Sequence, residues 1–226
     1  MKKRILLIGG NSKIARAFTK KYFSKYQIDI TLYKKNDIGQ FLNEIDTYQL
    51  NLTNDISIKN LIKKLKDYKY SGVLFFSSIY SNESNWNKSK FTKMLKINFL
   101  SYLDLIYNLK LVNNSKIIFF TDEGLIQPKK NYLYYSFSKA LLKDYIRFLA
   151  VEFAQTSSVI GIGLGPTTTD QKGPRIEQYY KRSLISVKNP CLGLINLIDF
   201  ILSEENFYST GKIIPFDGGT YIKRLT

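Results

Sequence analysis

Histidine is absent from the 226-residue sequence, and cysteine occurs once, at Cys191. The absence of histidine excludes histidine-dependent catalytic triads, histidine-ligated metal sites and histidine proton shuttles. A single cysteine excludes an intrachain disulfide and a multi-cysteine zinc cluster, and it is consistent with a reducing compartment. We therefore expect no metal site, and any catalytic chemistry must come from other side chains.

Long hydrophobic runs are also missing. The apolar run Ile5–Ile8 follows a basic start, but Gly9-Gly10 interrupts it too early for a signal peptide. The stretch Cys191–Leu202 contains two polar residues and is shorter than the roughly 20 apolar residues that a membrane span needs. We expect a cytoplasmic protein that does not associate with membranes.

Acidic residues are few: 18 Asp and Glu stand against 34 Lys and Arg, which gives a net charge of +16. The lysine pairs are scattered along the chain rather than gathered into one arm, so we expect no nucleic-acid partner. An anionic cofactor or substrate is the better explanation of the charge. The hydrophobic content of 44% is sufficient for a core, and no linker divides the chain, so residues 1–226 are expected to form one domain.

Segments typical of strands alternate with segments typical of helices along the whole chain. This alternation predicts an α/β fold: one doubly wound parallel sheet of about seven strands, flanked by helices on both faces. In such sheets ligands bind beyond the carboxyl ends of the strands. The expected strands are Arg4–Gly9, Ile28–Tyr33, Thr47–Leu52, Gly72–Ser77, Lys116–Phe120, Val159–Leu164 and Lys212–Phe216, and the expected helices are about Lys13–Tyr26, Ile56–Leu65, Phe91–Leu111, Tyr132–Phe153 and Pro190–Leu202.

The turn after the first strand, Gly9 to Ile14, leads directly into a helix. A helix start offers unpaired N–H groups and the positive end of the helix dipole, which suit a pyrophosphate. Gly9 permits a tight turn and Gly10 a close approach of the backbone. Lys13 stands where a dinucleotide-binding turn often has glycine, so an ordinary strand-to-helix turn remains an alternative.

The end of the second strand bears on cofactor choice. An acidic residue there usually holds the ribose 2′-hydroxyl of NAD, but this strand ends with Lys34 and Lys35. Two lysines favour a 2′-phosphate, so we expect NADP(H) in preference to NAD(H). The alternative is that both lysines are merely solvated.

Tyr135 and Lys139 stand four residues apart, which places them on the same face of a helix. A neighbouring cation favours the phenolate and is expected to lower the tyrosine pKa from its usual value near 10. Such a tyrosine can give a proton to a carbonyl oxygen while a nicotinamide delivers hydride.

With these motifs the chain resembles the short-chain dehydrogenase/reductase superfamily over nearly its whole length. The likeness rests on Gly9-Gly10 at the cofactor turn, Asn98 in a long helix, the Tyr135 and Lys139 pair, and Asp217-Gly218-Gly219 after the last strand. It implies a Rossmann-like fold and an NAD(P)H-dependent oxidoreductase in which Tyr135 donates the proton, Lys139 supports it and holds the ribose, and Asn98 holds a relay water.

The resemblance also implies which residues bind the cofactor. Pro166, Thr167 and Thr169 would lie beside the nicotinamide carboxamide. The complete implied set is Gly9, Gly10, Asn11, Ser12, Lys13, Ile14, Lys34, Lys35, Ser77, Ser78, Tyr135, Lys139, Pro166, Thr167 and Thr169.

One departure from the family pattern narrows the resemblance. The catalytic serine expected 13 residues before the tyrosine is Asp122 here. The pteridine reductase and dihydromonapterin reductase-like branch carries an aspartate at that place, which implies a pterin or dihydrofolate-like substrate. Asp122 would then orient the substrate or help to relay the proton; its alternative is an ion pair with Lys129 or Lys130.

Other functions stay open. Tyr132 stands seven residues before Lys139, the spacing of enoyl-acyl-carrier reductases. Reduction of a 3-oxoacyl-carrier protein or of a keto-sugar for surface polysaccharides is also compatible, as is a nucleotide-binding Rossmann protein without turnover. The substrate is thus expected to be a small carbonyl or imine compound, free, carrier-bound or nucleotide-linked.

Two further features are expected from the resemblance. The segment 170–188 would form a short lid on the substrate side. The long helices would pair between subunits, giving a homodimer or homotetramer.

Overall fold

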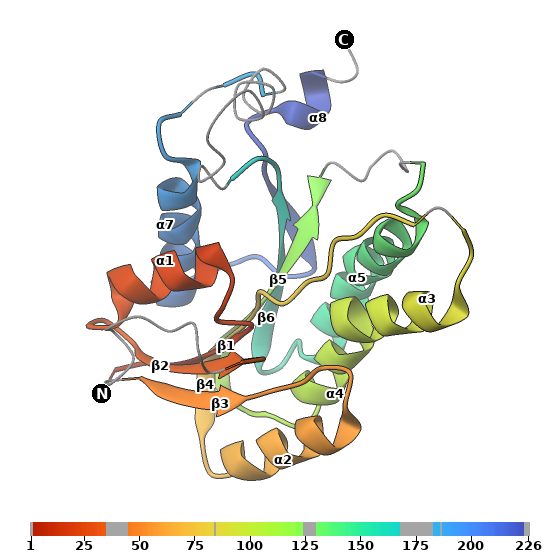
Figure 1. Ribbon diagram of the computed structural model, residues 1–226. Helices are drawn as coiled ribbons and strands as arrows, with labels where there is room; N and C mark the ends of the chain where they lie inside the picture. Colours follow the sequence, from red (N-terminus) through yellow and green to blue (C-terminus); the bar gives the residue numbers. More distant parts are fainter. Residues whose placement is uncertain are drawn as a thin grey trace.

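The computed structural model describes residues 2–34, 45–83, 85–123, 130–167, 183–185 and 187–223. Its centre is one parallel sheet with the strand order β3-β2-β1-β4-β5-β6-β7 (Figure 1). This arrangement confirms the predicted doubly wound α/β fold. The strands are β1 (Arg4–Ile8), β2 (Gln27–Leu32), β3 (Asp46–Gln49), β4 (Lys69–Phe75), β5 (Lys110–Asp122), β6 (Ser157–Leu164) and β7 (Lys212–Phe216).

Helices cover both faces of the sheet. One face packs against α1 and α7, and the other packs against α2, α4 and α5 (Figure 1). Along β1 the side chains alternate: Ile5 and Leu7 join the first core and Leu6 and Ile8 the second, and all four are fully buried. The helices are α1 (Lys13–Tyr22), α2 (Asp55–Leu65), α3 (Lys88–Leu95), α4 (Ser101–Ile106), α5 (Leu133–Glu152), α7 (Pro190–Ser203) and α8 (Thr220–Lys223).

The predicted single helix Phe91–Leu111 is wrong in two respects. A π-helical turn, Lys96–Leu100, separates α3 from α4, and the helix ends at Ile106. The turn holds the buried Asn98 against the backbone of Ile79, which is a tertiary contact that helical periodicity does not report. Leu109 and Leu111 continue the apolar spacing, but they pack against the core from the bend before β5 and from the start of β5, and not from a helix.

The amino ends of the strands are joined by a buried ion pair. Nε and Nη2 of Arg4 on β1 donate to the Asp29 carboxylate on β2 at 2.8 and 2.9 Å. The hydroxyl of Tyr70 on β4 donates to the same carboxylate at 2.6 Å. Asp29 is fully buried, so these bonds join β1, β2 and β4 near the amino ends of the strands. Ligands bind sheets of this kind at the opposite, carboxyl ends.

Candidate active site

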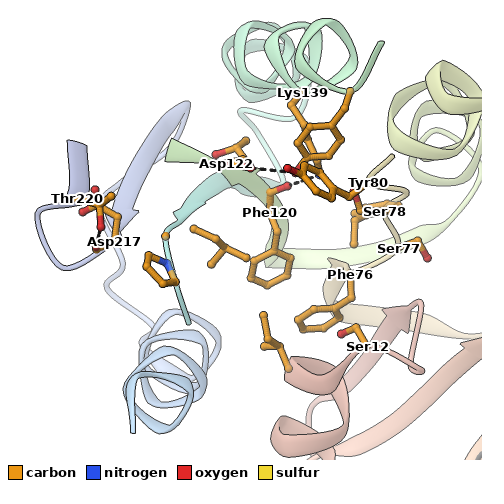
Figure 2. Close-up of a pocket in the computed structure, with 17 residues that line it drawn as sticks. Ser12, Phe76, Ser77, Ser78, Tyr80, Phe120, Asp122, Lys139, Asp217 and Thr220 are labelled. Atoms are coloured by element: carbon orange, nitrogen blue, oxygen red, sulfur yellow. Dashed lines mark hydrogen bonds between the residues drawn. The ribbon is translucent and has the colours of Figure 1, made fainter. Parts of the chain in front are cut away.

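Two adjoining cavities lie at the carboxyl ends of the central strands. One has a volume of about 310 Å³ and reaches from the start of α1 to β5, α5 and α8 (Figure 2). The other, of about 480 Å³, extends past the ends of β2 and β3. Both are lined by Ser12, Phe76, Ser77 and Ser78, so together they form one crevice across the point where the strand order reverses.

The turn between β1 and α1 packs closely against the next strands. Gly9 has φ +91°, and a Cβ there would lie 2.3 Å from Oγ of Ser77. At Gly10 a Cβ would lie 1.9 Å from Cγ2 of Ile30. Neither position has room for a side chain, and at Gly9 the backbone conformation itself favours glycine. Gly9 lines the larger cavity with its backbone, whereas Gly10 is buried and lines neither cavity.

Helix α1 begins beside this turn. Oγ of Ser12 accepts a 3.0 Å hydrogen bond from the N–H of Ala15, which caps the helix. Ser12 and Ile14 both line the 310 Å³ cavity, so the positive end of the helix dipole faces it. Asn11 lines the larger cavity, and its buried Oδ1 has no hydrogen-bond partner within the described part of the chain. Lys13 is exposed.

The larger cavity carries little negative charge. The described residues that line it include no Asp or Glu, and their charged member is Lys93 of α3. Tyr33, Asn51 and Thr53 line it at the ends of β2 and β3. Lys34 follows on the exposed surface, and Lys35 lies outside the described residues.

Tyr135, Lys139 and Asp122 meet in the smaller cavity. The Tyr135 hydroxyl donates a 3.1 Å hydrogen bond to Oδ2 of Asp122, at the end of β5. Nζ of Lys139, one helical turn further along α5, donates to the carbonyl oxygen of Phe120 at 2.9 Å. All three residues line the cavity, and Tyr135 and Lys139 are more than nine-tenths buried. Figure 2 shows Asp122 and Lys139 directed toward the same point from β5 and α5.

The electrostatics differ from the expectation of a tyrosine acidified by lysine. Burial, and then the charge and hydrogen bond of Asp122, raise the pKa of Tyr135 above its usual value. Burial lowers the pKa of Lys139 to about 8, against a smaller raising effect of Asp122. Burial and the Asp122 carboxylate therefore both disfavour the phenolate of Tyr135 in this structure.

Asn98 is fully engaged by protein groups. Its Nδ2 donates to the Ile79 carbonyl at 3.0 Å and to Oγ of Ser138 at 3.1 Å. Its Oδ1 accepts from the N–H of Ile79 at 2.8 Å and from Oγ of Ser78 at 3.4 Å. The side chain thus joins the segment after β4 to helix α5. Sequence reasoning missed Ser138, which sits between Tyr135 and Lys139 on α5.

The far wall of the cavity comes from the ends of β6 and β7. Gly165, Pro166, Asp217 and Thr220 line it (Figure 2). The Asp217 carboxylate accepts the N–H groups of Gly219 at 2.9 Å and Tyr221 at 2.8 Å, so it caps the start of α8. The Asp-Gly-Gly motif therefore has a structural explanation.

Some expected residues lie off this wall. Thr167 is buried outside the cavity lining. Thr169 and most of the expected lid 170–188 lie outside the described residues.

Aromatic rings form the rim of the cavity, an arrangement that no sequence motif predicts. Tyr80 lines the cavity, with its ring edge-on to Tyr135 at 4.8 Å and stacked on Tyr132 at 4.9 Å. Phe76 and Phe120 stack at 4.5 Å on the cavity floor. Tyr132 contributes to the rim only through Tyr80 and does not line the cavity.

No protein-family model matches the sequence, and no curated protein matches it either. Solved structures do match. A short chain dehydrogenase family protein from Francisella tularensis gives a TM-score of 0.86 at 20% identity, covering 98% of this chain and 99% of that one. A short chain dehydrogenase from Burkholderia cenocepacia in complex with NADP gives 0.85 at 18% identity, covering 96% and 97% of the two chains.

A short chain dehydrogenase from Leptospira borgpetersenii with bound NAD+ gives a TM-score of 0.84 at 18% identity, with 98% of this chain and 93% of that one covered. These proteins share the fold of this chain. Identities of this size establish the fold alone, so the assignment to the pteridine reductase-like branch stays a prediction.

Proposed function

We propose that the protein is an NAD(P)H-dependent oxidoreductase that reduces a C=O or C=N group of a small molecule, with Tyr135 as the proton donor. One observation carries the proposal: the Tyr135 hydroxyl, held by Asp122, and the Lys139 ammonium line a cavity that adjoins the glycine turn of α1. The shared fold of NADP-bound and NAD+-bound short chain dehydrogenases supports it.

The crevice has features that fit a dinucleotide. Gly9 and Gly10 leave the turn without side chains, and Asn11 offers a buried acceptor without a described partner. When bound, such a cofactor supplies hydride from its nicotinamide ring. The lack of described acidic residues in the larger cavity, together with Lys93 there and Lys34 nearby, supports a preference for NADP(H) over NAD(H).

The chain's own residues would handle the proton. The Tyr135 hydroxyl lines the cavity and carries the proton that it would give to a substrate oxygen or nitrogen there. Its raised pKa opposes this transfer, so the phenolate needs stabilisation as the proton leaves. Asp122 orients the hydroxyl, and the cation of Lys139 stabilises the phenolate that forms. The stacked rings of Phe76 and Phe120 keep water from the cavity floor.

The alternatives make different demands on the site. Enoyl reduction by Tyr132 is disfavoured because that residue does not line the cavity. A pterin or dihydrofolate-like compound, a 3-oxoacyl-carrier protein and a nucleotide-linked keto-sugar remain the substrate candidates. A nucleotide-binding protein without turnover would bind the cofactor and reduce none of them.

We also propose a homodimer or homotetramer in the cytoplasm. Helix α5 supports self-association, because Phe148 and Val151 on its surface are 64% and 78% exposed. The described helices include none that is long and apolar enough to span a membrane. Light scattering of the purified protein tests the oligomer.

NADPH absorbance tests the function directly. The wild type should consume NADPH with at least one of dihydrobiopterin, a β-ketoacyl thioester and a quinone. Tyr135→Phe should lose about 10²–10⁴-fold in kcat while it still binds NADPH. Tyr132→Phe is the matched control and should stay within a few-fold of the wild type. Tight NADPH binding without turnover of any carbonyl compound would contradict the proposal.

A further inference from the structure

The start of α5 lacks the usual local cap, although it carries the proposed proton donor. The residue before the helix, Tyr132, makes no side-chain cap, and the first turn contains no acidic residue. The first N–H groups of a helix have no partner within the helix, so they need acceptors from elsewhere. Tyr135 is the third residue of this turn.

Glu83 supplies one such acceptor from 51 residues upstream. The N–H of Tyr134 donates to Oε1 of Glu83 at 2.6 Å. The N–H of Glu83 itself donates to the carbonyl of Asn131 at 2.8 Å, where the chain turns with φ +67°. Glu83 therefore bonds the chain on both sides of Tyr132, and its negative charge lies at the positive end of the helix dipole.

The side chain of Tyr134, on α5, in turn bonds to the segment that follows Glu83. Its hydroxyl accepts the N–H of Asn87 and donates to the carbonyl of Asn85 at 3.2 Å. Its ring is 2% exposed and packs edge-on against Trp86 at 5.5 Å. The segment after β4 and the start of α5 are thus fastened to each other by backbone and side chain.

The second oxygen of the Glu83 carboxylate is also buried. Within the described part of the chain, the buried Oε2 of Glu83 has no hydrogen-bond partner. A buried carboxylate oxygen without a donor lowers stability. A Ser, Asp or Asn side chain at position 132 would cap the helix locally, and the donor and acceptor of that hydrogen bond would both lie close to solvent.

We propose that Glu83 is a positioning residue that fixes Tyr135, and with it the Tyr135–Asp122 bond, relative to the segment that carries Tyr80. This inference rests on the proposed function. Glu83 sits three residues after Tyr80, whose ring stands against Tyr135, and its bond is to the residue directly before Tyr135. A displacement of about 1 Å in a catalytic group can cost about 10²-fold in rate.

Two variants and one control test the inference. Glu83→Ala removes the acceptor, Glu83→Gln keeps an acceptor oxygen without the charge, and Asp144→Ala removes an exposed acid of α5 that pairs with Arg147. Glu83→Ala should lose about 10–100-fold in kcat with its NADPH affinity within twofold of the wild type. Glu83→Gln should recover most of the lost rate, and Asp144→Ala should match the wild type.

A spectroscopic readout separates this inference from the activity. In protein labelled with ¹³C-tyrosine, the Tyr135 ring resonance, assigned by its loss in Tyr135→Phe, should shift in Glu83→Ala and stay in place in Glu83→Gln and Asp144→Ala. If the wild type shows no turnover, the proposed function fails while this resonance still decides the role of Glu83. An unmoved resonance in Glu83→Ala overturns the inference, as does a kcat within twofold of the wild type.

Discussion

The hydroxyl of Tyr135 donates its hydrogen bond to the carboxylate of Asp122 and not to a neutral acceptor. The carboxylate keeps the proton on the phenol, and Lys139 lies 5% exposed beside the same strand end, bonded to the Phe120 carbonyl. In the proposed reaction the charge of Lys139 would act once the proton has left Tyr135.

Lys139 gives the first prediction, a loss of activity at alkaline pH. Its pKa is lowered to about 8, so its positive charge disappears as the pH rises through that value. We expect kcat for carbonyl reduction to fall above about pH 8, and Lys139→Met to be at least about 10²-fold less active at pH 7. Initial rates from pH 6 to 10 check this; a flat profile in the wild type would contradict it.

The same residue predicts how stability depends on pH. Its pKa is lower in the folded than in the unfolded chain, so the unfolded chain binds more protons between about pH 8 and the ordinary lysine value. The wild type should therefore gain unfolding free energy relative to Lys139→Met as the pH rises through that window. Urea titrations of both proteins at pH 7.5 and 9.5 measure the difference, and an equal difference at both pH values would argue against the buried ammonium.

Gly9 should be intolerant of any side chain. In Gly9→Ala the methyl group would meet Ser77 in a backbone conformation that alanine rarely adopts. We expect a loss of about 1–3 kcal/mol in unfolding free energy and at least about tenfold weaker NADPH binding. Gly193→Ala, on the exposed face of α7, is the control, because the backbone there is helical and the nearest atom to the new methyl group would be a side-chain atom of Phe216, at 3.2 Å. Calorimetry and fluorescence titration provide both measurements.

Lys93 should contribute to cofactor choice. It is the charged residue among those described around the larger cavity. Lys93→Glu should lower the ratio of NADPH to NADH affinity by about tenfold, because a carboxylate repels a phosphate and can accept from a ribose hydroxyl. Lys110→Glu, at the other end of the sheet, controls for net charge. Equal ratios in wild type and Lys93→Glu would remove Lys93 from cofactor recognition.

The ion pair at the amino ends of the strands should affect stability without affecting catalysis. Asp29→Ala leaves Arg4 and the buried hydroxyl of Tyr70 without their shared acceptor. We expect a loss of about 3–5 kcal/mol in unfolding free energy and an unchanged kcat where the variant is folded. Denaturant unfolding beside a rate measurement in dilute urea separates the two effects.

Much of the fold was predictable because it depends on local pattern. Strand β7 and the start of α7 were predicted to the residue, since Ile213 and Ile214 favour a strand and Pro190 favours the first turn of a helix. The π-helical turn was not predictable, because the contact made there, between Asn98 and Ile79, joins residues 19 apart in the sequence. Helical spacing continues unbroken through it in the sequence.

The candidate site likewise has a part that could be predicted from the sequence and a part that could not. The four-residue spacing of Tyr135 and Lys139 places both on one helical face, and spacing alone brings them together. The direction of the pKa shift at Tyr135 could not be predicted, because it depends on burial depth and on which charge is nearer. Glu83 carries no local signal, because its partner Tyr134 is 51 residues away in the sequence.

The buried ion pair of Arg4 and Asp29 lies at the amino ends of the strands, and the cavity around Tyr135 lies at their carboxyl ends. The stabilising ion pair and the cavity are therefore separated along the direction of the strands. Stabilising substitutions can therefore be introduced around Arg4 and Asp29 without altering the side chains that line the cavity.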